Sequence, residues 1–227
     1  AFAKINKFLK EFPKALKEFE ALLNRNRIFI DRTAGVAEVS KEAALEYSWT
    51  GPLLRATGVD YDVRVSDPYS SYQDFDFEVP VGTSGDIYDR YLVRNEEMWQ
   101  SLRIIEQAME KLKSEEKGIF HADVPEFYLP PKQEVYNNME ALIYHFKIVM
   151  GEIDAPKAEV YHAVEGENGE LGFYLINDGG RTPYRLHYRR PSFINYQMFA
   201  PMSEGMLLSD AIINMSSMNI IAGELDA

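Results

Sequence analysis

The clearest pattern of apolar positions lies between residues 86 and 113. Its apolar residues, spaced by three or four positions, are Met98, Leu102, Ile105, Met109 and Leu112. This spacing places side chains on one face of a helix, and it recurs in residues 1–26 and 133–150. We therefore expect three long helices, the first of them kinked or broken at Pro13 because proline lacks a backbone N–H.

A different pattern predicts a small sheet. Residues 158–193 read as three short strands joined by two glycine-containing turns, residues 165–170 and 177–183. Turns of this kind connect antiparallel strands. Together with the helices, these strands predict an α+β fold with a helical core of long packed helices and a small antiparallel sheet near the C-terminus.

The segments between these elements are less regular. Residues 27–39 contain short β-branched runs and are expected to form a strand or extended chain, whereas Ser40 is a typical cap for a short helix after it. Residues 51–86 are rich in Gly, Pro, Asp and Tyr and show no sustained period. A loop of this length inside a globular chain is usually functional or part of an interface. Residues 205–217 predict a last short helix.

Charged residues stand at helical spacing at the start of the long helix. Asp86, Arg90 and Arg94 are each four positions apart, which predicts a solvated face with salt bridges. The preceding glycine-rich stretch, residues 82–85, lacks the strand and helix that frame a phosphate-binding loop. We therefore expect Asp86 to cap the helix, where a negative charge is favourable.

Composition excludes several classes of site. The net charge of −12 argues against a nucleic-acid-binding surface, because phosphate binding needs clustered Lys and Arg. Cysteine is absent, so the chain supplies neither disulfides nor thiolate metal ligands. Its four histidines lack the spacing of metal-binding motifs. The chain does not begin with Met and opens inside a helical pattern, so we expect a fragment of a longer protein.

Four blocks of sequence carry a family resemblance. Residues 51–109, 138–152, 169–193 and 205–227, in this order and spacing, resemble the D subunit of proton-pumping NADH–quinone oxidoreductase, respiratory complex I. The resemblance implies a hydrogenase-large-subunit-like fold, because this family is related to the large subunits of nickel–iron hydrogenases and has lost their nickel-binding cysteines. It also implies that residues 1–227 are the C-terminal portion of a single D-subunit domain whose N-terminal half is absent.

The resemblance further implies a role in a quinone-reducing module that couples electron transfer to proton translocation. The expected partners are the B subunit, which carries an iron–sulfur cluster, the C subunit, the H subunit of the membrane arm and the quinone itself, with no nucleic acid. This chain is expected to bind no cofactor, since the iron–sulfur cluster and NAD belong to other subunits, and to be inactive when isolated. As part of a bacterial complex it would lie peripherally on the cytoplasmic face of the inner membrane.

The resemblance assigns candidate residues but no catalytic residue to this chain. Met218, Asn219, Ile221 and Gly223 match the family's C-terminal segment, which is expected to line the quinone cavity. Asn219 stands where most members have Asp, and it keeps hydrogen-bonding capacity but cannot ionise; aspartate is expected to be tolerated there. Ala227 stands where most members end in Arg.

Two arginines in the irregular segment also match family positions. Arg55 and Arg64 are expected either to contact the cluster-bearing partner or to shape the cavity loop, or else to be buried, paired residues that hold the loop in place.

Two alternative functions remain open from the sequence. One is a large-subunit-like part of a membrane-bound hydrogenase, against which the absence of cysteine argues. The other is a non-catalytic interaction scaffold that has kept the same fold.

Overall fold

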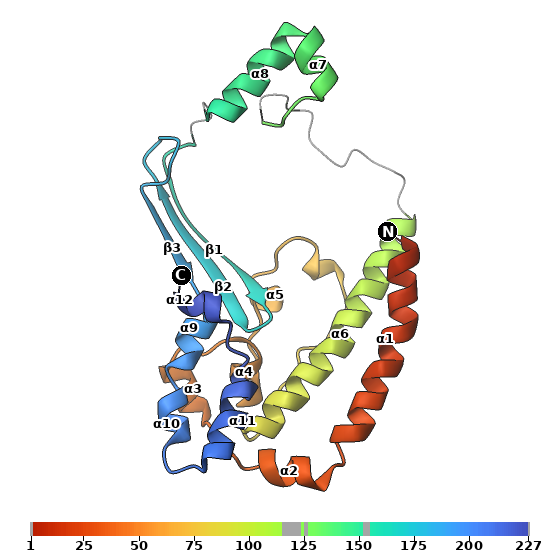
Figure 1. Cartoon of the computed structure of the whole chain (residues 1–227), viewed down its shortest axis with the longest axis vertical. Coiled ribbons are helices and arrows are strands. Elements are labelled where there is room, and N and C mark those ends of the chain that lie inside the picture. Colours follow the sequence, from red (N-terminus) through yellow and green to blue (C-terminus); the bar gives the residue numbers. More distant parts are fainter. Residues whose placement is uncertain (1, 115–123, 125–126, 152–154, 227) are drawn as a thin grey trace. The chain divides into compact units, whose positions relative to one another are not determined.

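The chain divides into two units. The computed structural model describes residues 2–114, 124, 127–151 and 155–226 (Figure 1). The first unit contains residues 1–114, 163–172 and 189–227, and the second contains residues 115–162 and 173–188. All candidate residues named from the sequence lie in the first unit.

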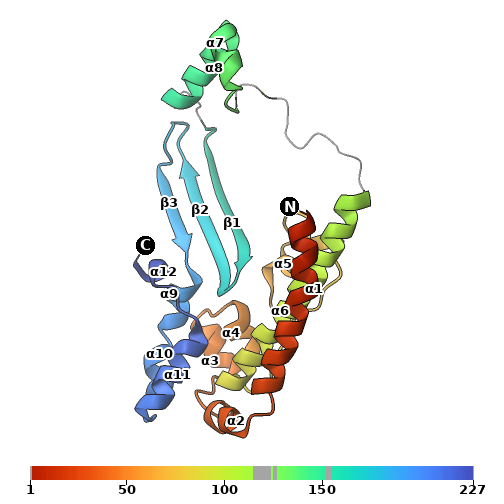
Figure 2. The ribbon, with the colours of Figure 1, turned by 45° about the vertical axis from the view of Figure 1, so that its right-hand side comes forward.

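The first unit is mainly helical. Before the long helix it contains α1 (Phe2–Leu23), α2 (Arg27–Thr33), α3 (Lys41–Glu46), α4 (Gly51–Ala56), α5 (Val63–Ser66) and the 3-10 turn η1 (Tyr72–Asp74). The long helix is α6 (Ile87–Ser114), and α9 (Pro191–Tyr196), α10 (Phe199–Ser203), α11 (Leu208–Met218) and α12 (Ala222–Asp226) follow later in the chain. Helices α1 and α6 lie side by side in both views (Figures 1 and 2), and they contact each other.

The sheet confirms the predicted strands and the α+β class. Strands β1 (Ala158–Gly166), β2 (Gly169–Asn177) and β3 (Arg185–Arg189) pair in the order β1-β2-β3. A tight turn at residues 167–168 connects the first two strands. Residues 163–172, which form this hairpin end, belong to the first unit. The second unit also contains α7 (Lys132–Asn137) and α8 (Met139–Met150).

Several expected elements differ from those observed. Residues 27–33 form helix α2 rather than an extended segment, because the Asn26 side chain accepts hydrogen bonds from the first-turn N–H groups of Ile28 and Phe29, at 3.0 and 3.4 Å. The helix expected over residues 133–150 is interrupted at Asn138, which has extended backbone angles and caps α8. Side-chain caps thus overrode the apolar pattern in both places.

Two further expectations about helices need correction. Helix α1 runs through Pro13 without a break, since a long helix packed against α6 can lose one backbone hydrogen bond and remain intact. The irregular segment of residues 51–86 contains the short helices α4 and α5. By contrast, Ser40 caps α3 as expected, accepting from the N–H of Ala43 at 3.2 Å.

The charged start of α6 is buried rather than solvated. Asp86 does cap the helix, accepting from the N–H of Asp89 at 2.7 Å. Arg90, however, is 0% exposed and lies over the Trp49 ring, 5.6 Å from its centre. It donates to Oδ1 of Asn214 at 3.1 Å and to two backbone carbonyls of the preceding loops. Burial, with a contribution from Arg94, lowers the pKa of Arg90 to about 9.

The core of the first unit joins two stretches that are far apart in the sequence, residues 37–87 and 198–218. Its buried apolar residues are Ala37, Val39, Ala44, Trp49, Leu53, Leu54, Ile87, Met198, Met202 and Met218. Ile220 packs against this cluster from its edge. The C-terminal segment therefore closes the hydrophobic core of its own unit.

The start of α4 approaches the β1–β2 turn closely enough to require glycine on both sides. Gly51 has φ +69°, and a Cβ there would lie 2.4 Å from the Cα of Gly169. Gly169 has φ +132°, and its Cβ would lie 2.5 Å from Oγ1 of Thr50. The same hydroxyl accepts from the N–H of Glu170 at 3.0 Å. This contact fixes the hairpin end of the sheet against α4.

We expect Gly51→Ala to destabilise the first unit more than Gly205→Ala does. Gly205 has φ +76°, but a Cβ at that position would meet no atom within 4 Å, so it controls for backbone strain alone. The added clash at Gly51 should lower the free energy of unfolding by about 1–3 kcal/mol beyond the control. Denaturant unfolding followed by tryptophan fluorescence measures both variants. Equal decreases in the free energy of unfolding for Gly51→Ala and Gly205→Ala would contradict the close contact between α4 and the β1–β2 turn.

Candidate functional site

The site begins with the short buried helix α4. Its first residues are Gly51 and Pro52, and proline suits the first turn because the N–H that it lacks has no helical partner there. All six residues of α4 are buried, and the helix packs against α6. The sequence therefore carries Arg55, near the end of α4, into the interior of the unit.

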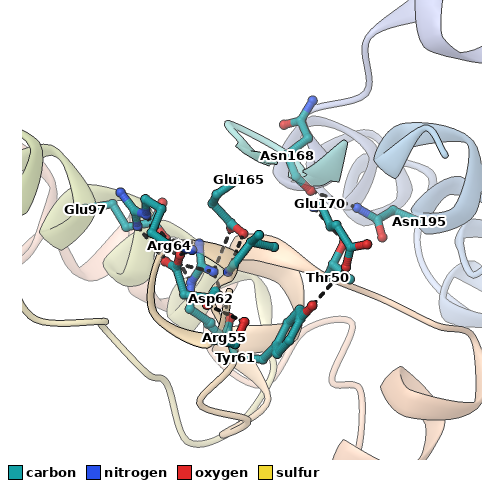
Figure 3. Close-up of polar contacts among 12 residues, drawn as sticks. Thr50, Arg55, Tyr61, Asp62, Arg64, Glu97, Glu165, Asn168, Glu170 and Asn195 are labelled. Carbon is teal, nitrogen blue, oxygen red and sulfur yellow. Dashed lines mark hydrogen bonds and ion pairs between the residues drawn. The ribbon is translucent and has the colours of Figure 1, made fainter. Parts of the chain in front are cut away.

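Arg55 is the centre of a buried ion-pair cluster (Figure 3). Only 1% of Arg55 is exposed. Its Nε donates to Oε1 of Glu97 on α6 at 3.0 Å, and Nη2 donates to the same oxygen. Its Nη1 donates to Oε1 of Glu165 on β1 at 2.8 Å and to the Tyr61 carbonyl at 3.0 Å. The Asp62 carboxylate lies 3.4 Å from Nη1.

Asp62 connects Arg55 to the second candidate arginine. It caps α5, accepting from the N–H of Arg64 at 2.8 Å, and it also accepts from Nη2 of Arg64 at 2.6 Å. The Arg64 guanidinium lies 5.0 Å from the centre of the Phe77 ring, a cation–π distance. Both arginines are therefore paired with carboxylates, and the partner of Arg64 lies in the same segment of residues 51–86.

Opposing effects set the protonation of the cluster. Burial alone would lower the pKa of Arg55, but the surrounding carboxylates raise it above its ordinary value. Burial alone would raise the pKa of Asp62, but the hydrogen bonds and charge of Arg64, and the charge of Arg55, hold it below its ordinary value. For Glu165 burial outweighs the attraction of Arg55, so its pKa is raised.

A cavity of about 490 Å³ adjoins this cluster. Arg55, Arg64 and Asn219 all line it, together with the carboxylate-bearing Glu97 and Glu165. Asn219 is more than 150 positions from Arg55 and Arg64 in the sequence, and the fold brings all three to one cavity. We call it the polar cavity.

The C-terminal candidates do not share one environment. Asn219 lines the polar cavity, whereas Met218 is 1% exposed within the core. Ile221 is 44% exposed, and its N–H donates to Oγ of Ser192 at 3.3 Å. Gly223 is exposed, with open space around it. In this unit Met218 belongs to the core and Asn219 lines the polar cavity, whereas Ile221 and Gly223 are exposed.

Asn219 is matched to its surroundings as an amide. It ends α11 with φ +52°, a left-handed conformation that asparagine tolerates. Its Nδ2 donates to Oε1 of Glu167 at 2.7 Å and to Oδ1 of Asn168 at 2.8 Å. A carboxylate could make neither donation and would face the negative charge of Glu167.

Sequence reasoning missed the acidic half of the site. Asp62, Glu97 and Glu165 were not singled out, and no local pattern joins Glu165 to an arginine 110 positions earlier. Of the histidines, His121 lies outside the described residues. Within the described ranges no group of three or more His, Asp or Glu could hold a metal ion, and none of the helices described there combines the length and the hydrophobicity of a membrane span.

Comparison with known proteins identifies the family. The family model for the 49 kDa subunit of respiratory-chain NADH dehydrogenase matches residues 1–227. The chain belongs to this family. Over all 227 residues it is 66% identical to one of the D subunits of NADH-quinone oxidoreductase from Cytophaga hutchinsonii, and equally to the D subunit from Flavobacterium johnsoniae. It is 52% identical over 222 residues to the D subunit from Leptospira biflexa.

These comparisons confirm the resemblance to the D subunit. The chain spans 58% of the Cytophaga relative, 55% of the Flavobacterium relative and 54% of the Leptospira relative, while 98–100% of the chain is covered. The 49 kDa family assignment therefore extends over the whole chain, and the chain accounts for little more than half the length of these relatives.

Replacing Arg55, the cation at the centre of the ion-pair cluster, should strongly destabilise the first unit. Arg55→Met leaves buried carboxylates without a partner, which costs about 3–5 kcal/mol. The control is Arg103→Met on α6, because Arg103 and its partner Asp76 are 41% and 78% exposed and such pairs contribute about 0–1 kcal/mol. Both tryptophans, Trp49 and Trp99, lie in the first unit, so their fluorescence reports its denaturant unfolding. If Arg55→Met lowers the free energy of unfolding no more than Arg103→Met does, the proposed stabilisation by the Arg55 cluster is contradicted.

The depressed pKa of Asp62 predicts a pH dependence with a definite sign. Since its folded pKa lies below the unfolded value of about 3.9, its stabilisation is complete above that pH and is lost as the pH falls through the folded pKa. The difference in unfolding free energy between wild type and Asp62→Asn should therefore narrow below about pH 4. The control is Asp76→Asn at an exposed residue, whose unfolding free energy should differ little from that of wild type at every pH. If the difference in unfolding free energy between wild type and Asp62→Asn stays constant as the pH falls, the lowered pKa of Asp62 is contradicted.

The contacts of Asn219 give a prediction contrary to the expectation from family resemblance. Asn219→Asp should lower the free energy of unfolding by about 1–2 kcal/mol, because two hydrogen bonds are lost and two carboxylates are brought together. Asn137→Asp, at an exposed amide with one local hydrogen bond, is the control. Thermal unfolding compares them, and an unchanged melting temperature for Asn219→Asp would restore the original expectation.

Proposed function

We propose that this chain forms part of the quinone-reducing module of an NADH–quinone oxidoreductase, in which quinone reduction is coupled to proton translocation. The names of its relatives support an oxidoreductase with NADH and quinone as substrates. The observation that carries the proposal for this chain is geometric. Arg55 and Arg64 from the segment of residues 51–86, and Asn219 from the C-terminal segment, match family positions and line one cavity.

The three residues have different roles in this proposal. Arg55 is almost fully buried and ion-paired, so it positions the loop and the carboxylates rather than contacting quinone. Arg64 and Asn219 reach the polar cavity from opposite ends of the chain, and they shape its wall. Ile221, two residues beyond Asn219, does not line the polar cavity in this unit, but its exposed apolar side chain is suited to contact an isoprenoid quinone in the assembled enzyme.

The proposal assigns electron entry to other subunits. An iron–sulfur cluster on the B subunit would donate electrons, NAD would bind elsewhere, and the B, C and H subunits would contact this one. This subunit would lie peripherally on the cytoplasmic face of a bacterial inner membrane, as part of a membrane complex. The isolated chain is then inactive with NADH and quinone, and the polar cavity is completed only in the assembled enzyme.

Ile221→Phe in the assembled enzyme tests the proposal. Because Ile221 is 44% exposed, the larger ring should not disturb folding, but it should obstruct a ligand at this wall. We expect the affinity of a quinone-site inhibitor to fall about tenfold, the effect of misfit in an apolar pocket. Electron transfer from NADH to an artificial acceptor should stay normal.

The control is Leu45→Phe on α3, which is 52% exposed and lies on a helix that does not line the polar cavity. It should leave the inhibitor constant unchanged. Titration on equal amounts of assembled enzyme separates binding from assembly. An unchanged inhibitor constant for Ile221→Phe would contradict the quinone wall, and a loss of assembly alone would assign the C-terminal segment to core closure.

A further inference from the structure

A second cavity of the first unit lies between α1, α2, α6 and α11, with a volume of about 330 Å³. Its wall is largely apolar and includes Phe19, Phe29, Ile87, Met98 and Ile213. The hydroxyls of Thr33 and Ser217, which also line it, donate to carbonyls of their own helices at 2.7 Å. These hydroxyls therefore require no partner from outside.

Two polar side chains in this wall remain unsatisfied. Nε and Nη2 of Arg94 and Oδ1 of Asn95 are buried and have no hydrogen-bond partner among the described residues. Burial also lowers the pKa of Arg94. A buried guanidinium without an anion is unfavourable, so such groups normally have a carboxylate or another acceptor.

The neighbouring carboxylates do not supply this acceptor. Arg94 also lines the polar cavity, where the charges of Glu97 and Glu167 act on it, but Glu97 is paired with Arg55 and Glu167 accepts from Asn219. No ion pair among the described residues includes Arg94, and the lining of the second cavity contains no Asp or Glu. A direct acceptor for Nε and Nη2 of Arg94 would therefore come from outside the described residues.

The helices that line the second cavity also carry exposed apolar side chains, here called its rim. These are Leu22 on α1, Ile28 on α2, and Ile212 and Met215 on α11, which are 67%, 76%, 61% and 47% exposed. Exposed apolar patches of this kind mark surfaces that another polypeptide covers. We call the cavity with its rim the Arg94 groove.

We propose that the Arg94 groove receives a segment of the full-length subunit that lies outside these 227 residues, and that this segment places an Asp or Glu carboxylate against Arg94. Two observations select this occupant. Relatives of 66% identity contain much further sequence, since the chain spans only 58% and 55% of them. The groove combines exposed apolar side chains with one half-buried arginine whose Nε and Nη2 lack an acceptor, which fits an amphipathic helix with a single acidic residue. The inference rests on family membership and does not depend on the quinone proposal.

Site-specific photo-cross-linking in the full-length subunit, within its assembled complex, tests the occupant. The photoreactive amino acid p-benzoylphenylalanine replaces Phe19, which lines the groove and is 42% exposed. Phe8, on the same helix and 43% exposed, is the matched control and does not line the groove. Mass spectrometry should identify an Asp- or Glu-containing peptide from outside the 227 residues at position 19 and not at position 8.

Other cross-linking results would overturn the proposal. These results are a product confined to residues 1–227, a product with another subunit, an adduct with lipid or quinone, or no product at position 19.

A charge swap then tests the carboxylate. Arg94→Glu should reduce the cross-link yield from position 19 more than about tenfold, because it breaks a buried pair. The control Arg103→Glu, on the same helix but in an exposed pair, should change the yield less than about twofold. Replacing the identified carboxylate by Arg in the Arg94→Glu background should restore the yield.

The double variant, with Arg94→Glu and Arg in place of the identified carboxylate, also provides a test if Arg94→Glu alone fails to assemble. Recovery of assembly by the swapped pair would then support the proposal, and continued failure would overturn it. An unchanged cross-link yield in assembled Arg94→Glu would overturn the carboxylate contact.

Discussion

The first unit is organised by the need to neutralise one buried charge. Arg55 is 1% exposed, and burying a guanidinium is costly unless charge pairing and hydrogen bonds offset the loss of water. The Arg55 cluster meets this need with Glu97 from α6, Glu165 from β1 and Asp62 from the intervening loop. A single side chain thus requires three distant segments to meet, and the polar cavity forms where they do.

Local signals in the sequence predicted much of the fold but little of this cluster. The period of α6, the Ser40 cap and the turns of the sheet depend on neighbouring residues, so they could be read directly. The burial of Arg90 could not, because charged residues at helical spacing usually face water. Glu165 meets Arg55 only after the hairpin end packs on α4, a contact that depends on Gly51 and Gly169. The family resemblance identified the arginines and Asn219, but it gave no information on their partners.

Helix α6 connects the two cavities of the unit. Arg94 and Met98 on this helix line both the polar cavity and the Arg94 groove. A segment that docks in the groove would therefore contact the same side chains that bound the proposed quinone site. Assembly of the full-length subunit and formation of the quinone cavity would then both depend on α6 and on the charge of Arg94.

The most direct test of the account is a structure of the assembled enzyme with a quinone-site inhibitor bound. The account predicts inhibitor atoms within about 4 Å, ordinary contact distance, of Asn219 or Ile221, with the Arg55 cluster intact behind them. An inhibitor bound elsewhere, with Asn219 and Ile221 both covered by polypeptide, would contradict it.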